Sequence, residues 1–104
     1  MDRMQKLREF LAADPDDSFS RHALAMEYLA MGDEVMARQL LEEVLERDAS
    51  AVGSYYQLGK LLERAGETAL AVQWYDRGMA AARAAGENRA YNELRTAHDD
   101  LTDS

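Results

Sequence analysis

Apolar residues recur at every third or fourth position along most of the chain, with charged residues between them. This spacing indicates one apolar face of an α-helix, because an α-helix completes a turn in about 3.6 residues. Six stretches show it, separated by short runs that contain glycine or acidic residues. Their apolar positions are Met4, Leu7, Phe10 and Leu11; Leu24, Ala25 and Tyr28; Ala37, Leu40, Leu41, Val44 and Leu45; Tyr55, Leu58, Leu61 and Leu62; Ala71, Trp74, Tyr75 and Met79; and Tyr91, Leu94, Ala97 or His98, and Leu101. The pattern predicts six helices joined by short turns, which suits antiparallel neighbours.

The same residues return after a fixed interval. The pair Gly32-Asp33 is followed 34 positions later by Gly66-Glu67. The same offset relates Ser20 to Ser54, Leu24 to Leu58, Ala37 to Ala71 and Gln39 to Gln73. A constant period of this length indicates stacked helix pairs. We therefore expect a single domain with a half repeat over residues 1–17, a first repeat over 18–51, a second over 52–85, and a capping helix and tail over 86–104.

The predicted turns carry residues that favour helix ends. Gly32 can adopt the positive φ that often follows a helix. Asp33 can cap the next helix by accepting hydrogen bonds from its free backbone N–H groups, and Ser50 is a candidate cap for the helix after that. The run Asp14-Pro15-Asp16-Asp17 lacks the central glycine and the distal glutamate of a calcium loop. We interpret this run as a helix stop followed by an N-cap.

The repeated unit resembles the tetratricopeptide repeat family over residues 18–85. The second repeat carries that family's pattern at Tyr55, Leu58-Gly59, Leu62, Gly66-Glu67, Ala71 and Tyr75. The first repeat departs from the pattern by placing Arg21 at the large opening position, and both repeats have another residue, Ala49 or Arg83, in place of the exit proline. The resemblance implies an all-α fold, an α-solenoid of antiparallel helix pairs. Gly59 and Ala71 are expected to meet where two helices cross closely.

The composition narrows the classes of partner. Hydrophobic residues make up 47% of the chain, and cysteine is absent, which excludes disulfides and thiolate zinc sites. A net charge of −8 repels nucleic acid and anionic membranes, and the sequence shows neither a secretory signal nor a membrane span. We expect a cytoplasmic protein without a cofactor or metal. The acidic, lysine-poor composition is compatible with salt adaptation, in which case molar salt should raise the melting temperature, and equally with an ordinary solvated surface.

In the family that the chain resembles, the first helix of each pair lines a concave surface that contacts ligands. Transferred to this chain, that surface contains Phe19, His22, Met26, Tyr56, Lys60 and Arg64. Such a groove would suit a short helix or an extended peptide with an apolar anchor and an acidic end. Alternatively, the N-terminal helix buries Phe19 and Met26, while Lys60 and Arg64 form solvated ion pairs. His22 has no second histidine at ligand spacing, so we expect a groove or surface residue rather than a metal ligand.

The sequence favours binding over catalysis. It contains no glycine-rich phosphate loop, no histidine pair at zinc spacing and no nucleophile with a nearby base. The leading hypothesis is a scaffold or adaptor that binds a protein segment in its groove. The alternative is a structural role through homo-oligomerisation by a terminal helix. We expect a monomer, and a weak homodimer if this alternative holds. Trp74 is expected to pack beneath the last helix or to anchor an interface.

Overall fold

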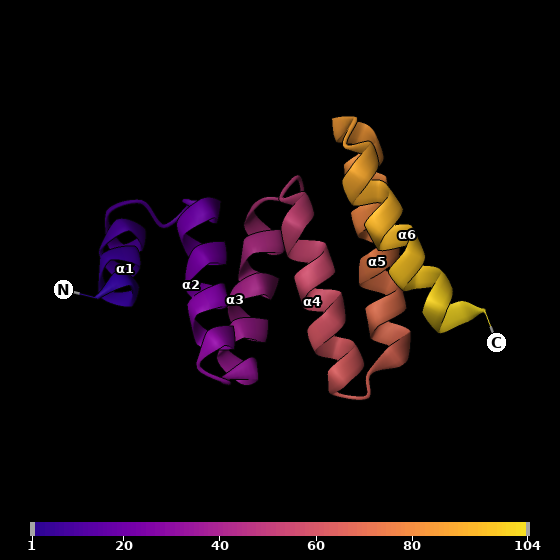
Figure 1. The fold of residues 1–104 in the computed structure, drawn as a ribbon. Helices are drawn as coiled ribbons and strands as arrows, with labels where there is room; N and C mark the ends of the chain where they lie inside the picture. Colours follow the sequence, from indigo (N-terminus) through magenta and orange to yellow (C-terminus); the bar gives the residue numbers. More distant parts are fainter. Residues whose placement is uncertain (1, 104) are drawn as a thin grey trace. The chain divides into compact units, whose positions relative to one another are not determined.

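The structure is a computed structural model that describes residues 2–103, and all regular secondary structure in that range is helical. The helices are α1 (Arg3–Ala13), α2 (Ser18–Ala30), α3 (Glu34–Arg47), α4 (Val52–Arg64), α5 (Thr68–Ala85) and α6 (Asn88–Thr102), drawn in Figure 1. They fall into two compact units, one ending at Asp48 with α1 to α3 and one beginning at Ala49 with α4 to α6. None of these helices is both long and apolar enough to cross a membrane.

The helix ends follow the predicted turn chemistry. Gly32 and Gly66 have φ angles of 82° and 80°, a backbone conformation that would be strained in a residue with a side chain. In both turns the next residue donates its backbone N–H to a carbonyl in the last turn of the helix: Asp33 to Tyr28 and Glu67 to Leu62, each at 2.9 Å. These bonds satisfy carbonyl groups that the helix leaves open, and they reverse the chain within a few residues. Consecutive helices within a unit therefore pack as antiparallel neighbours.

Aspartate side chains cap two helices as predicted. Asp33 accepts a hydrogen bond from the backbone N–H of Met36 at 3.1 Å at the start of α3. Asp17 accepts from the Ser20 hydroxyl at 2.6 Å and from the Ser20 N–H at 3.1 Å at the start of α2. These bonds favour the ionised carboxylate and hold the pKa of Asp17 below its ordinary value.

The predicted cap at Ser50 is wrong. Helix α4 begins at Val52 with Ala51 in the cap position, and Ala51 has no side-chain group that could cap the helix. A capping side chain reaches the N–H two or three residues ahead only from the cap position itself, and Ser50 lies one residue too early. Helix α3 ends before this turn at Asp48, whose N–H donates to the Val44 carbonyl at 2.8 Å.

In the first unit, α2 packs against both α1 and α3. Arg21 is only 7% exposed and fills the position that Tyr55 occupies in the second unit. Its Nε lies 3.5 Å from a Glu43 carboxylate oxygen, and the aliphatic stem supplies the packing of a large apolar residue. The apolar stripe predicted on α1 is only partly inward: Leu7 is buried, but Phe10 is 54% exposed. Helix α1 packs against α2, and a single neighbouring helix covers only a narrow stripe of the α1 surface.

In the second unit, two glycines bring three helices into close contact. A Cβ atom on Gly59 would lie 2.1 Å from Cε1 of Tyr75, so the Tyr75 ring rests directly on the backbone of α4. The sequence predicted that Ala71 would meet Gly59; Ala71 is fully buried, but the side chain on Gly59 is Tyr75. A Cβ on Gly78 would lie 2.6 Å from Cβ of Tyr55 and 3.1 Å from Cδ1 of Leu94.

Gly78 was not singled out from the sequence, yet its contacts draw both α4 and α6 onto α5. As a result α4 also contacts α6 directly. Trp74 is half-buried, and its ring centroid lies 6.0 Å from that of Tyr55 on α4 and 4.8 Å from the Arg77 guanidinium carbon. Its expected position beneath the last helix stays a prediction.

Replacing Gly59 by alanine should test this packing directly. We expect Gly59→Ala to lower the free energy of unfolding by about 1–3 kcal/mol, because the new methyl group would overlap the Tyr75 ring. The matched control is Gly53→Ala in the same helix, where an added Cβ meets nothing within 4 Å. Chemical denaturation followed by circular dichroism measures both. Equal midpoints for the two variants would refute the close contact.

Candidate functional site

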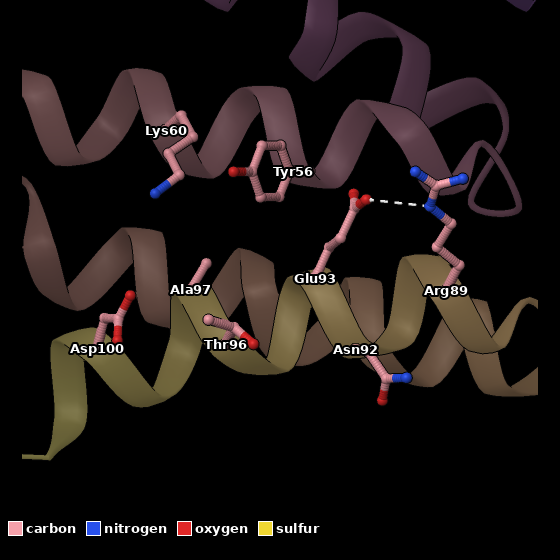
Figure 2. A pocket seen from close by; sticks show the side chains of 8 residues that line it. All are labelled: Tyr56, Lys60, Arg89, Asn92, Glu93, Thr96, Ala97 and Asp100. Atoms are coloured by element: carbon pink, nitrogen blue, oxygen red, sulfur yellow. Dashed lines mark ion pairs between the residues drawn. The ribbon is translucent and has the colours of Figure 1, made fainter.

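A cavity of about 650 Å³ lies between α4 and α6, within the second unit. Figure 2 shows the eight residues that line it. Two come from α4 and six from α6: Tyr56 and Lys60, then Arg89, Asn92, Glu93, Thr96, Ala97 and Asp100. The α4 residues are one helical turn apart, and the α6 residues recur at intervals of three or four, so each set lies along one side of its helix.

The α4 wall is held by contacts around Lys60. The Lys60 ammonium lies 5.5 Å from the centre of the Tyr56 ring, within the range of a cation–π contact. It also lies 3.4 Å from a Glu63 carboxylate oxygen. That same oxygen accepts a hydrogen bond from the Tyr75 hydroxyl. Glu63 therefore offsets the charge of Lys60 and connects the wall of the cavity to the packed interior.

Tyr75 keeps its hydroxyl as a hydrogen-bond donor over a wide pH range. Burial raises the pKa of Tyr75 far above its ordinary value of 10.0, and the neighbouring Glu63 carboxylate raises the pKa further. The Tyr75 ring also lies against Tyr56, with 6.4 Å between their centroids. The hydroxyl stays protonated at neutral pH and continues to bind Glu63.

The α6 wall follows from the way α6 packs on α5. Leu94 and Ala97 are 1% and 3% exposed, so they fix which side of α6 turns inward. Figure 2 shows the Ala97 side chain directed toward α4. The polar residues beside this stripe then face the cavity, with Glu93 pairing with Arg89 at 3.8 Å. The α6 wall thus combines the small apolar side chain of Ala97 with amide, hydroxyl and charged groups.

Of the six groove residues predicted from the sequence, Tyr56 and Lys60 line the cavity. Arg64 is the exposed last residue of α4 and is not among the lining residues. The other three are on α2 in the first unit. Phe19 is 79% exposed, so the alternative that the N-terminal helix buries Phe19 is wrong; Met26 and His22 are half-buried. Burial lowers the pKa of His22, which keeps its imidazole neutral at pH 7.

Sequence reasoning missed the α6 side of the cavity. The 34-residue register is lost after Ala85, so α6 was interpreted only as a cap. The available signal was the position of the buried stripe at Leu94 and Ala97: the residues next to it on one side are 92, 93, 96 and 100. Among the described residues, 2–103, no cluster of His, Asp and Glu side chains has the arrangement of a metal site.

Comparisons with known proteins agree with the repeat pattern. The family model for the tetratricopeptide repeat matches residues 20–50 and 52–84. A TPR repeat-containing protein of Pseudomonas aeruginosa is 31% identical over 91 residues, which cover 88% of this chain and 87% of that protein.

Solved structures show the same fold. The crystal structure of a tetratricopeptide repeat domain protein from Salinibacter ruber is 39% identical, with a TM-score of 0.81, and the match covers 84% of this chain and 98% of that one. A solution structure of a protein from Bordetella parapertussis is 26% identical, with a TM-score of 0.79, and covers 98% of this chain and 89% of that one. The predicted fold class, an all-α helical repeat of the solenoid type, is confirmed.

Because its pKa is raised, the Tyr75 hydroxyl should not ionise together with the other tyrosines when the folded protein is titrated to alkaline pH. Because the folded-state pKa lies above the unfolded value near 10, this hydroxyl contributes fully to stability below pH 10 and loses its contribution as the pH rises further. Phenolate absorbance between pH 10 and 11 should therefore be the same in folded wild type and folded Tyr75→Phe. In denaturant, wild type should titrate one more tyrosine, five in all. An extra phenolate in the folded wild type would contradict the buried hydrogen bond.

Proposed function

We propose, from the finding that the chain belongs to the tetratricopeptide repeat family, that it binds a segment of another protein in the cavity between α4 and α6. Repeats of this family are generally protein–protein interaction modules. The single observation that carries the proposal is the composition of the cavity lining. Tyr56 and Ala97 offer apolar contact, while Asn92 and Thr96 offer an amide and a hydroxyl to a peptide backbone.

A scaffold or adaptor role fits this surface better than the other classes of partner. The cavity is lined by two basic and two acidic side chains, whereas a nucleic-acid site needs a basic surface. The net charge of −8 also opposes binding to nucleic acid and to anionic membranes. We propose binding rather than catalysis, with no cofactor. The cytoplasmic location expected from the sequence stays a prediction.

The remaining groove residues predicted from the sequence form part of the proposal. On α2, Phe19 presents an exposed aromatic ring that could serve as an apolar anchor, with His22 and Met26 on the same helix. Arg64 at the end of α4 adds a cation. Their contribution to ligand binding stays a prediction, separate from the cavity in the second unit.

The second candidate function is self-association through the terminal helix α1. The observation that favours it is Phe10, which leaves 54% of its surface exposed on that helix. We expect a monomer at micromolar concentration and at most weak dimers at millimolar concentration. Sedimentation of wild type and Phe10→Glu at both concentrations tests this. A dimer that forms at micromolar concentration and disappears in Phe10→Glu would favour the structural role.

Filling the cavity should remove partner binding without unfolding the protein. Thr96 is an exposed lining residue, so Thr96→Trp places an indole in the cavity and leaves the buried face of α6 intact. Gln73→Trp adds the same side chain at an exposed position on α5 that does not line the cavity. Immobilised wild type and Gln73→Trp should recover the same partner from the native host, identified by mass spectrometry, and Thr96→Trp should lose it.

Thermal denaturation of the two tryptophan variants provides the control for folding. With equal melting temperatures, a partner that Thr96→Trp still recovers would rule out the cavity as the binding site.

A further inference from the structure

The charges around the cavity are unevenly neutralised. Lys60 has the Glu63 carboxylate 3.4 Å away, and Arg89 has that of Glu93 at 3.8 Å. Asp100, by contrast, makes no ion pair or hydrogen bond within residues 2–103. The cavity therefore contains one carboxylate whose charge no residue of the described range offsets with an ion pair.

The position of Asp100 in α6 increases its preference for a cation. Asp100 lies in the last turn of α6, where the open carbonyl groups give the helix a partial negative charge. This last turn contains no basic residue. The neighbouring Asp99 has partners of its own: it pairs with Arg95 at 3.6 Å, and one of its oxygens lies 3.3 Å from Nδ1 of His98. A positive group from a ligand would complement both the carboxylate and the helix end.

Lys60 does not fill this role from across the cavity. Figure 2 shows Lys60 on α4 and Asp100 on α6 at the same end of the cavity. The Lys60 ammonium is held by Glu63 and by the Tyr56 ring on its own helix. Taken together, Lys60, Glu63 and Asp100 carry one net negative charge at this end.

The apolar side chain of Ala97 determines which kind of group a ligand must place next to its basic group. Ala97 and Asp100 are three residues apart on α6, a separation of about 4.5 Å along the helix axis. A ligand that uses both needs an apolar and a basic side chain on the same face. Positions i and i+2 of an extended segment, or i and i+3 or i+4 of a helix, provide this arrangement.

We propose that the ligand of this cavity is a protein segment that packs an apolar side chain on Tyr56 and Ala97 and places an adjacent lysine or arginine against Asp100. The inference rests on the proposed function and deepens it. It reverses the acidic end predicted from the sequence. That hypothesis needed Lys60 as a free cation, whereas the alternative left open from the sequence was an ion pair, and the structure pairs Lys60 with Glu63.

Selection from a random 12-residue peptide library displayed on phage tests this preference without assuming a sequence. Wild type should enrich peptides with lysine or arginine next to an apolar residue. A synthetic fluorescein-labelled peptide with the enriched sequence should bind Asp100→Lys roughly tenfold more weakly by fluorescence polarisation, since a repulsion replaces an attraction. Raising the salt concentration from 20 to 500 mM should also weaken its binding to wild type.

The charge-matched control is Asp103→Lys, which changes the net charge equally at a residue that does not line the cavity. It should bind the peptide with close to wild-type affinity. An equal loss in both lysine variants would overturn the contact with Asp100, because the effect would then come from overall charge.

The Thr96→Trp variant separates the two proposals. Acidic or uncharged peptides whose binding Thr96→Trp abolishes would leave the proposed function standing and overturn the preference for a basic segment. A selection that yields no peptide sensitive to Thr96→Trp would overturn both.

Discussion

The contact between Gly59 and the Tyr75 ring is the constraint on which the candidate site depends. Because Gly59 has no side chain, the ring lies directly on the backbone of α4, and the Tyr75 hydroxyl reaches Glu63. Glu63 in turn holds Lys60, which lies over Tyr56 on the cavity wall. A single packing contact in the interior thus determines how two half-buried side chains are positioned on the cavity wall. A buried, protonated hydroxyl makes this connection insensitive to pH near neutrality.

The second wall of the cavity follows from the same principle at Gly78. Its missing side chain admits Tyr55 from α4 and Leu94 from α6 to the surface of α5. Once Leu94 and Ala97 are buried, the polar side of α6 faces α4. A helix that follows the last repeat therefore also supplies most of the residues that line the cavity. The same arrangement leaves Asp100 at a helix end with no ion pair or hydrogen bond among residues 2–103, which supports the proposed preference for a positive group.

The sequence predicted the features that depend on local chemistry. Gly32 and Gly66 were identified because a positive φ after a helix requires glycine, and Asp33 because a capping side chain acts on the next few residues. Tyr56 and Lys60 were found through the resemblance to a repeat family. These inferences need no knowledge of how helices rotate against one another.

The features that were missed or wrong depend on packing between helices. Asp100 and its neighbours on α6 face the cavity only because α6 has one rotational setting on α5, and the repeat register that could have indicated that setting ends before α6 begins. The cap at Ser50 failed by one residue, since the turn before α4 has no glycine to mark the helix start. The sequence did not decide whether Phe19 is buried or exposed, because the spacing of apolar residues does not tell whether another helix covers this side chain.

The central claim is that a protein segment occupies the space between α4 and α6. The most direct measurement is the change in backbone amide NMR shifts when the labelled protein is titrated with a peptide that it selects. The account predicts that the largest changes fall at Tyr56, Lys60, Thr96 and Asp100, while exposed residues of α5 such as Gln73 stay unchanged. Changes centred on α5, with the cavity residues unaffected, would contradict it.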